Sequence, residues 1–425
     1  MLLVISILTL IPIVIWASIE PLSLRFLDVN TATTSIGQIL GLAGMTLFSI
    51  NLILAGRFKF LDKYFKGLDK VYVHHSKIGS LSFSLILFHP IFLVVKYLSI
   101  SIREAGLFFV PFLNMPITWG IISLILMIGL LSVTLYINLK YHVWKLSHKF
   151  MILAFFFAIL HVLNISSDVS RSNLLNYYIL TLAFIGLAVS FHQAFLNKFL
   201  SKKFKYKIAN IKELNENVAE IEMEPVKEGI NFENGQFAFF SFQSEGVSSE
   251  SHPFTISSSS KDNNLKITVK NLGDFTGLLK NLKLGDKVII DGPYGNFSYN
   301  KVESKDQIWI AGGIGITPFL SMVKNLGSEY NVDLYYSVKE NKEAVYLQNL
   351  KEISEKTPNF KFNLWEAKDK GYINGNAISD RSNGLDSKDI FLCGPPSFME
   401  SLKNQFLSLG VDLNKIHYEN FSFFD

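Results

Sequence analysis

The chain of 425 residues contains a single cysteine, Cys393. One cysteine excludes an intrachain disulfide framework and any zinc or iron–sulfur site made of several cysteine ligands. Charged residues are also scarce, at 18% of the sequence against roughly 25% in soluble domains. The formal net charge of +4 is small, and the basic residues lie beside apolar segments, which favours membrane topology over nucleic-acid binding.

Nearly all long apolar runs lie in the first 200 residues. Crossing the hydrocarbon core of a bilayer takes roughly 20 helical residues. Six segments are long enough, near residues 2–19, 33–55, 75–98, 116–137, 146–166 and 175–196. No Lys or Arg precedes the first of them, whereas a cleaved signal peptide has a basic segment there, so we expect this segment to be retained as a span. The first half is therefore predicted to be a multi-pass bundle surrounded by membrane lipid.

Basic residues are concentrated in alternate loops. Segment 56–73 contains five Lys or Arg residues, and further lysines lie near 138–149 and 198–205. The other three loops contain one basic residue each, namely Arg25, Arg103 and Arg171. By the positive-inside rule, the N-terminus and the whole C-terminal half are predicted to be cytoplasmic, with the chain in the cell membrane.

Histidines occur inside two of the expected spans, where ionisable residues are costly and indicate function. His75 and His89 are fourteen residues apart, which is about 21 Å of helix rise and about 40° short of whole turns. They therefore share one helix face, near opposite leaflets. His148 and His161 are thirteen residues apart, or about 20 Å of rise, which matches the other pair in depth. Two helices that offer imidazole at the same two depths predict two stacked haems, each held by two histidines.

Local geometry adds three expectations. On an ideal helix, thirteen residues misalign His148 and His161 by about 140°, so we expect a π-bulge or kink between them; the alternative is that the two haems meet this helix on different sides. His74 is the alternative to His75 as a ligand. Gly79 lies one turn after His75, where a small residue would let a flat macrocycle approach the backbone.

The second half has two kinds of pattern. Residues 206–300 contain short alternating strands with turn residues, such as GQFAFFSFQ and KVIIDGPYG, which predict a small antiparallel barrel. From residue 305 onward, strands alternate with helical stretches, which predicts a parallel sheet with helices on both faces.

A glycine-rich turn follows the first strand of this predicted sheet and opens a helix. It consists of Gly312, Gly313, Ile314, Gly315, Ile316, Thr317 and Pro318. Such a turn lets backbone N–H groups approach a pyrophosphate, although a plain tight turn is the alternative. Cys393-Gly394-Pro395-Pro396 follows a later apolar strand, at the same expected edge, where ligands bind in open α/β sheets.

These features resemble the ferric reductase / NADPH oxidase family, whose members join a six-span bis-haem membrane domain to a ferredoxin-NADP reductase-like domain. The resemblance covers nearly the whole chain and rests on the paired histidines, the HPFT segment 252–255, AGGIGITP and LCGPP. It implies an α-helical membrane bundle of six transmembrane helices in residues 1–200, an FAD-binding antiparallel β-barrel in 204–300 and an NAD(P)H-binding α/β parallel-sheet domain in 305–425. The implied cofactors are FAD, two b-type haems and NADPH or NADH.

The resemblance also implies roles for two flavin segments. In His252-Pro253-Phe254-Thr255, Thr255 would lie near flavin N5, Phe254 beside the ring and His252 near the FAD phosphates, where soluble reductases usually have Arg. In the segment from Lys270 to Thr276, Gly273 and Thr276 would hold the pyrophosphate.

For the nicotinamide, the resemblance implies that Cys393 lies near C4 and aids hydride geometry without acting as a nucleophile; a small buried strand residue is the alternative. Ser337 and Lys339 stand where the family commonly has an Arg for the 2′-phosphate of NADPH. Phe421, in the aromatic C-terminal tail, would stack on the isoalloxazine ring, with Phe423 as the competing candidate and domain-edge packing as the alternative.

The implied activity is electron transfer from cytoplasmic NAD(P)H through FAD to an inner haem on His75 and His148, then to an outer haem on His89 and His161. Oxygen as acceptor would make the chain a superoxide-producing NADPH oxidase, and a ferric chelate would make it a ferric reductase. A partner protein would make it an electron-donating membrane subunit. The outer loops are short, with few charges such as Glu104 and Asp168, which favours a small acceptor. The sequence has no N-terminal EF-hand pattern, and we expect activity without an activating subunit.

Overall fold

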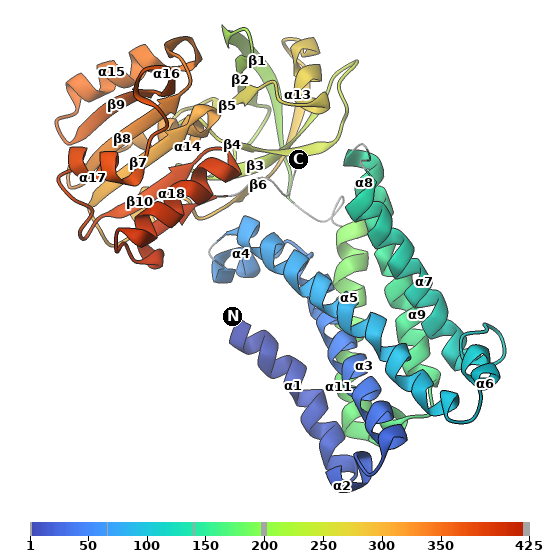
Figure 1. The fold of residues 1–425 in the computed structure, drawn as a ribbon. Coiled ribbons are helices and arrows are strands. Elements are labelled where there is room, and N and C mark those ends of the chain that lie inside the picture. The colour runs from blue at the N-terminus through green and yellow to red at the C-terminus, as the bar shows by residue number, and fades with distance from the viewer. Residues whose placement is uncertain (1, 66, 138, 140, 197–201, 420–425) are drawn as a thin grey trace. The chain divides into compact units, whose positions relative to one another are not determined.

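The computed structural model describes residues 2–65, 67–137, 139, 141–196 and 202–419. The chain divides into two compact units, residues 1–61 with 70–200 and residues 62–69 with 201–425. Figure 1 shows the first unit as a bundle of helices and the second as strands and helices together.

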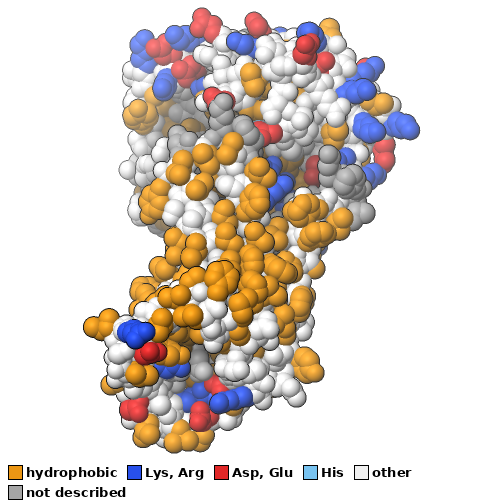
Figure 2. All heavy atoms as spheres, turned by 90° about the vertical axis from the view of Figure 1, so that its right-hand side faces the viewer, with side chains coloured by type: hydrophobic (Ala, Val, Ile, Leu, Met, Phe, Trp, Pro, Cys, Tyr) orange, Lys and Arg blue, Asp and Glu red, His pale blue; other side chains and the backbone are white. Residues whose placement is uncertain are grey.

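The helical unit contains long apolar helices and short connecting ones. Its elements are α1 (Leu2–Ile19), α2 (Leu22–Arg25), α3 (Val29–Leu54), α4 (Lys59–Phe65), α5 (Leu68–Leu98), α6 (Ile102–Leu107), α7 (Met115–Tyr136), α8 (Tyr141–Lys149), α9 (Met151–Asn164), α10 (Asp168–Arg171), α11 (Asn173–Phe191) and the π-helix η1 (His192–Leu196). Among the described residues, five helices are long and apolar enough to cross a membrane, and Leu3–Ile19 is a shorter apolar helix. All six expected spans therefore coincide with apolar helices. Figure 2 shows hydrophobic side chains gathered on the face of this bundle that is turned to the viewer.

Side-chain caps fix where several of these helices begin. The Asp28 carboxylate accepts the Thr31 N–H at 2.8 Å, and the Thr31 hydroxyl accepts the Asp28 N–H, which closes a capping box at the start of α3. Ser101 and Ser172 cap α6 and α11 through their hydroxyl oxygens. Polar residues in the loops thus fix the positions at which these helices begin.

The helix that contains His148 and His161 is interrupted between them. α8 ends at Lys149 and α9 begins at Met151. The Phe150 N–H donates to the carbonyl of Ser147, three residues earlier, at 3.0 Å, which makes a tighter turn than that of an α-helix. The expected distortion is therefore confirmed, but it is a tightened turn in place of a π-bulge. The one π-helix among the described residues is η1, at the end of the last apolar helix.

The first part of the second unit is an antiparallel six-stranded sheet. Its elements are β1 (Phe204–Asn215), β2 (Val218–Pro225), β3 (Phe237–Gln243), β4 (Ser251–Thr255), β5 (Leu265–Lys270), α13 (Asp274–Leu278), η2 (Leu279–Asn281) and β6 (Lys287–Tyr294). The strand order is β4-β3-β6-β1-β2-β5. A bridge between Ile256 and Ile267 joins the two ends of this order and closes the sheet into a barrel. Side chains alternate between the two faces of each strand, and those that point inward, such as Ile221 and Met223 of β2, fill the interior of the barrel.

The second part is a parallel sheet with helices on both faces. After η3 (Tyr299–Lys301), its elements are β7 (Asp306–Gly312), η4 (Gly313–Ile316), α14 (Thr317–Val323), β8 (Asn331–Val338), η5 (Asn341–Glu343), α15 (Leu347–Lys356), β9 (Phe360–Glu366), α16 (Ala367–Lys370), α17 (Gly375–Arg381), β10 (Asp389–Cys393), α18 (Pro396–Ser408), η6 (Leu413–Lys415) and β11 (Ile416–Tyr418). The strand order is β11-β10-β7-β8-β9. Along β7, Trp309 faces one apolar core and Ile308 the other, so both sheet faces are covered. The predicted fold class is thereby confirmed.

Candidate functional site

The four span histidines meet in two pairs. The rings of His75 and His148 have centroids 6.0 Å apart, and those of His89 and His161 are 6.4 Å apart. Two metal–imidazole bonds of about 2 Å each, together with the two ring radii, give a centroid separation of roughly 6 Å. Both pairs therefore have the spacing of two imidazoles that bind one metal ion from opposite sides. The ring opposite His148 belongs to His75, and not to its neighbour His74.

Hydrogen bonds orient three of these rings. Nδ1 of His75 lies 3.0 Å from the carbonyl oxygen of Asn51, and Nδ1 of His89 lies 2.6 Å from that of Gly37. Nδ1 of His161 lies 2.7 Å from the carbonyl oxygen of Pro116. A ring that donates through Nδ1 presents Nε2 as the metal ligand. The fourth ring, His148, stacks on Trp144 at a centroid distance of 5.6 Å.

Two glycines make room for the pair on α5 and α9. A Cβ added at Gly41 of α3 would lie 2.7 Å from Nδ1 of His89, and one at Gly120 of α7 would lie 3.0 Å from Nδ1 of His161. Sequence reasoning missed both residues, although small residues within apolar spans mark close approaches. Gly79, expected to face a macrocycle, instead faces α3, because its added Cβ would lie 2.8 Å from the Asn51 side-chain amide.

A cavity of about 620 Å³ surrounds the His89–His161 pair. Residues of α3, α5, α7 and α9 line it, among them Gly41, Met45, Leu93, Gly120 and Val162. Only 11% of the most apolar stretch of α5 is buried, against 61% for α3. Much of α5 therefore lies at the surface of the bundle, while its histidine face approaches α3 closely at Gly41 and Gly79. The ring spacing, the oriented Nδ1 atoms and this apolar cavity fit a haem.

Arg25 and Asp168, at the α2 and α10 end of the bundle, form a buried ion pair. Arg25 donates to the Asp168 carboxylate at 2.8 Å and to the Trp16 carbonyl at 2.9 Å, with its guanidinium 3.9 Å from the Trp16 ring centroid. Arg25 and Asp168 are 4% and 5% exposed. Asp168, one of the few outer-loop charges noted in the sequence, is thus neutralised inside the bundle. Lys96 and Asp168 line both the apolar cavity and a smaller polar cavity of about 310 Å³ beside it.

The two flavin segments expected in the barrel lie against each other. His252 of β4 stacks on Phe275 of α13, with centroids 3.5 Å apart, and its Nε2 lies 3.5 Å from the Glu250 carboxylate. Thr255 ends β4 and pairs with Phe237 of β3. Phe254 packs against Phe240 inside the barrel wall. The structure thus brings 252–255 and 270–276 together.

Within the second flavin segment, Thr276 organises the turn that precedes α13. Its hydroxyl oxygen accepts the N–H groups of Leu272 and Gly273 at 2.9 and 3.0 Å. Lys270 ends β5 directly before this turn. No atom of the described residues lies within 4 Å of a Cβ added at Gly273, so the turn is open on that side in this part of the chain. Open backbone at the start of a helix is suited to a phosphate group.

The glycine-rich turn and the Cys-Gly-Pro segment lie side by side at one edge of the parallel sheet. Cys393 pairs with Ala311 in register, and a Cβ at Gly315 would collide with the Cys393 carbonyl. A Cβ at Gly394 would lie 3.1 Å from Cα of Gly312. Gly312 pairs in turn with Ser337 of β8, and Lys339 follows, exposed. Glycine is therefore required where these backbones approach. Gly313 (φ +55°), Thr317, Pro318 and Pro395 complete this edge.

Cys393 and Glu419 are both buried, with exposed fractions of 6% and 5%. Burial, together with the charge of Glu419, raises the pKa of the Cys393 thiol, so the neutral thiol is favoured. The role of Cys393 beside the nicotinamide stays a prediction. Sequence reasoning gave Glu419 no role, because no local pattern predicts that a glutamate beside an aromatic tail is buried. Phe421 and Phe423 lie outside the described residues.

Comparison with known proteins identifies three domains in this chain. Residues 40–159 match the ferric reductase like transmembrane component, residues 203–298 an FAD-binding domain and residues 309–404 an oxidoreductase NAD-binding domain. The class is therefore a multi-pass membrane protein that contains a flavin- and NAD-binding oxidoreductase module. Together the domains give the chain a ferric reductase / NADPH oxidase-like architecture, and the resemblance seen in the sequence is confirmed.

Similar proteins match mainly the second unit. The chain is 27% identical over 228 residues to the toluate 1,2-dioxygenase electron transfer component of Pseudomonas putida, covering 51% of this chain and 66% of that protein. It is 32% identical over 146 residues to flavohemoprotein A of Dictyostelium discoideum, covering 33% and 36%. The chain thus spans less than two thirds of the length of either relative. A flavohemoglobin from Malassezia yamatoensis is similar in fold, with a TM-score of 0.51, 18% identity and coverage of 93% of this chain and 98% of that one.

Proposed function

We propose that the chain is a transmembrane oxidoreductase of the cell membrane that moves electrons from cytoplasmic NAD(P)H through FAD and two haems to external oxygen, which it reduces to superoxide. The observation that carries this proposal is that two histidines of α5 each face a histidine of α8 or α9. The ring centroids of these two pairs are 6.0 and 6.4 Å apart. The reductase module at the C-terminal end supports NAD(P)H as the electron source.

Bound FAD and haem would supply the redox chemistry, because a flavin accepts two electrons together and releases them singly. The chain's part is to hold these groups. His75 and His148 would hold one haem, and His89 and His161 would hold the other. With two histidines at each site, the bound haems would supply electron transfer without binding the acceptor.

In the second unit, the open turn at Gly273 and Thr276 would bind the FAD pyrophosphate, with Thr255 beside the flavin ring. The turn from Gly312 to Pro318 would bind the pyrophosphate of NAD(P)H, with Ser337 and Lys339 beside the ribose. Cys393 would exclude water beside the nicotinamide as a neutral, buried thiol.

A small acceptor is supported by the far end of the bundle. The ion pair of Arg25 with Asp168 is buried there. Lys96 lines two cavities, which measure about 620 and 310 Å³. Oxygen fits such spaces without rearrangement. A ferric chelate is the second candidate, because residues 40–159 match the ferric reductase membrane component.

The decisive assay follows NADPH and NADH consumption by the detergent-purified chain alone, under air and under argon, with and without a ferric chelate. The proposal expects consumption that requires air, together with cytochrome c reduction that superoxide dismutase inhibits. Consumption under argon that requires the chelate would replace oxygen with ferric iron as the acceptor. No consumption without an added protein partner would contradict the expectation of independence from activating subunits.

A further inference from the structure

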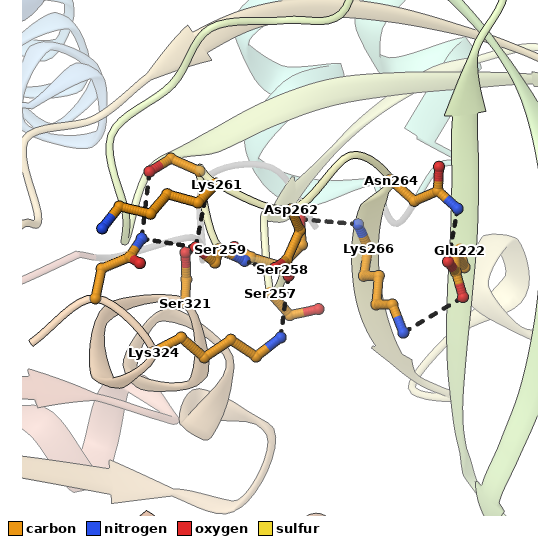
Figure 3. A network of polar contacts seen from close by, with 12 residues as sticks. Glu222, Ser257, Ser258, Ser259, Lys261, Asp262, Asn264, Lys266, Ser321 and Lys324 are labelled. Carbon is orange, nitrogen blue, oxygen red and sulfur yellow. Dashed lines mark hydrogen bonds and ion pairs between the residues drawn. The ribbon is translucent and has the colours of Figure 1, made fainter. Parts of the chain in front are cut away.

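The barrel and the parallel-sheet lobe of the second unit are joined by a polar network beside α14. Figure 3 shows Ser321 and Lys324 facing the loop 257–262, which connects β4 to β5 in the barrel. The Ser321 hydroxyl donates to the Ser258 carbonyl at 2.6 Å, and both residues are fully buried. A serine within a helix usually bonds back to its own helix, whereas this one bonds across to the other lobe.

Two further contacts extend this connection. The Asn325 amide donates to the Ser259 hydroxyl at 2.6 Å, and Lys324 forms an ion pair with Asp262 at 3.1 Å. The Asp262 carboxylate also accepts the Ser259 N–H at 3.0 Å, which closes the loop on itself. The loop is therefore held by its own turn, and it is attached to the parallel-sheet lobe by Ser321 of α14 and by Lys324 and Asn325, which directly follow that helix.

A second connection starts from the loop before α15. The Tyr346 hydroxyl lies 2.6 Å from the Glu220 carboxylate and 2.8 Å from the Thr268 hydroxyl, both in the barrel. Thr268 donates onward to the Ser257 hydroxyl at 3.1 Å, so both connections reach the same loop. Tyr346 has a left-handed backbone, φ +63°, which costs free energy for a non-glycine residue and indicates that surrounding contacts hold it in place.

The connected loop and helix are each close in sequence to an expected cofactor segment. Ser257 follows Thr255 by two residues, and Ser321 follows Thr317 by four. Gly235 adds close packing at the same place, because a Cβ there would collide with the Met322 side chain of α14. The polar network therefore joins residues that directly follow the flavin segment 252–255 to residues that directly follow the dinucleotide turn 312–318.

We propose that Ser321 and Asn325, with Tyr346 in support, are positioning residues for hydride transfer; this rests on the proposed binding of flavin and NAD(P)H. The step they position moves one hydride, with its two electrons, from C4 of the nicotinamide to N5 of the flavin, leaving NAD(P)⁺ and reduced flavin. The network fixes the distance between the two rings by holding the dinucleotide turn against the flavin segment. A displacement of about 1 Å at such a junction can slow a reaction by roughly 100-fold.

The test uses the full-length protein carrying Ser321→Ala and Asn325→Ala together. Flavin reduction by NADPH and by NADH is followed by stopped flow under argon, and charge-transfer absorbance is recorded after NADP⁺ or NAD⁺ is added to the reduced protein. We expect flavin reduction to slow by about tenfold or more, with charge-transfer absorbance lost and FAD content unchanged. Tyr346→Phe, which keeps the ring packing, should slow the step to a smaller extent.

Ser354→Ala is the matched control, because the Ser354 hydroxyl also donates to a carbonyl, that of Phe360 at 3.0 Å, but within one lobe. It should leave both readouts unchanged. Wild-type rates and absorbance in the Ser321/Asn325 variant would overturn the inference, as would equal slowing in Ser354→Ala. A wild-type flavin that neither NADPH nor NADH reduces would overturn the proposed function itself.

Discussion

At the residue scale, each imidazole ring of the bundle is held by a neighbour that fixes its orientation. Backbone carbonyls of Asn51, Gly37 and Pro116 accept from three rings, and Trp144 stacks on the fourth. The three carbonyl partners fix the tautomer and the direction of the ligating nitrogen in their rings. The proposed haem sites therefore depend on residues that are not themselves ligands.

Single histidine substitutions should remove the proposed haems one at a time. His148→Ala deletes one ring of the pair with His75, and His161→Ala one ring of the pair with His89. Each variant is expected to retain one haem of the two, because a bis-histidine site loses an axial ligand. The pyridine haemochrome assay gives the haem-to-protein ratio. His192→Ala, at the end of the last apolar helix, is the control and should retain both haems; two haems in either test variant would refute the ligand assignment.

Gly41→Ala should disturb the same site without removing a ligand. The added methyl would lie 2.7 Å from Nδ1 of His89, so the ring has to leave the carbonyl of Gly37. We expect loss or spectral change of the haem at the His89–His161 pair, measured as a fall in haem content and a shift in its reduction midpoint. Gly129→Ala is the control, since nothing lies within 4 Å of a Cβ there. Equal spectra for the two variants would show that Gly41 is not needed for ring placement.

At the element scale, strands β2 and β5 are joined by a cross-strand ion pair. Glu222 and Lys266 stand opposite each other in register, with Nζ 3.3 Å from the carboxylate, and Asn264 donates to Glu222 at 2.8 Å. The Asn264 hydrogen bond and the nearby Lys266 lower the pKa of Glu222, although partial burial acts against them. A lowered folded-state pKa means that the carboxylate stabilises the barrel above its unfolded pKa of about 4.3, and that this contribution is lost as pH falls through the folded value.

Glu222→Gln should therefore destabilise the second unit at pH 7 but not at low pH. Because the pair is partly exposed, the expected loss is about 0.5–1 kcal/mol, or roughly 1–4 °C in Tm for a unit of this size. Flavin fluorescence during heating at pH 7 and at pH 3.5 measures it. Glu224→Gln is the control. Glu224 lies on the same strand as Glu222 and forms an exposed ion pair with Lys207 of β1, so its loss should have little effect. A Glu222→Gln deficit that stays constant with pH would contradict the assignment.

The elements also show what could be read from the sequence. Apolar length predicted the helices, and strand alternation predicted the barrel and the parallel sheet, because both depend on local periodicity. The distortion near His148 followed from counting residues between two ligands, but its form, a tight turn at Phe150, depends on packing that no local pattern specifies. The contacts of Gly41 and the pairing of Arg25 with Asp168 join residues far apart in sequence, so a single sequence could not predict them.

At the scale of the whole molecule, the buried Arg25–Asp168 pair ties the α2 and α10 ends of the bundle together across 143 positions of sequence. Removing one partner from a buried pair typically costs about 3–5 kcal/mol, because the other charge stays behind uncompensated. The buried pair thus helps to hold the bundle end beside the His89–His161 cavity, and the network around Ser321 joins the two lobes of the reductase unit.

The proposed direction of electron flow requires that the reductase unit and the α6 loop lie on opposite sides of the membrane. Basic residues before α5, after α7 and after α11 support a cytoplasmic reductase unit. Single cysteines test this, because Cys393 is buried, the pKa of its thiol is raised, and Cys393→Ser removes it as background. In that background, a membrane-impermeant maleimide added to intact cells should label Arg103→Cys, an exposed site in α6, and should label Lys227→Cys only after the membrane is opened. Labelling of Lys227→Cys alone in intact cells would invert the topology, and electrons from cytoplasmic NAD(P)H could then not enter through this reductase unit.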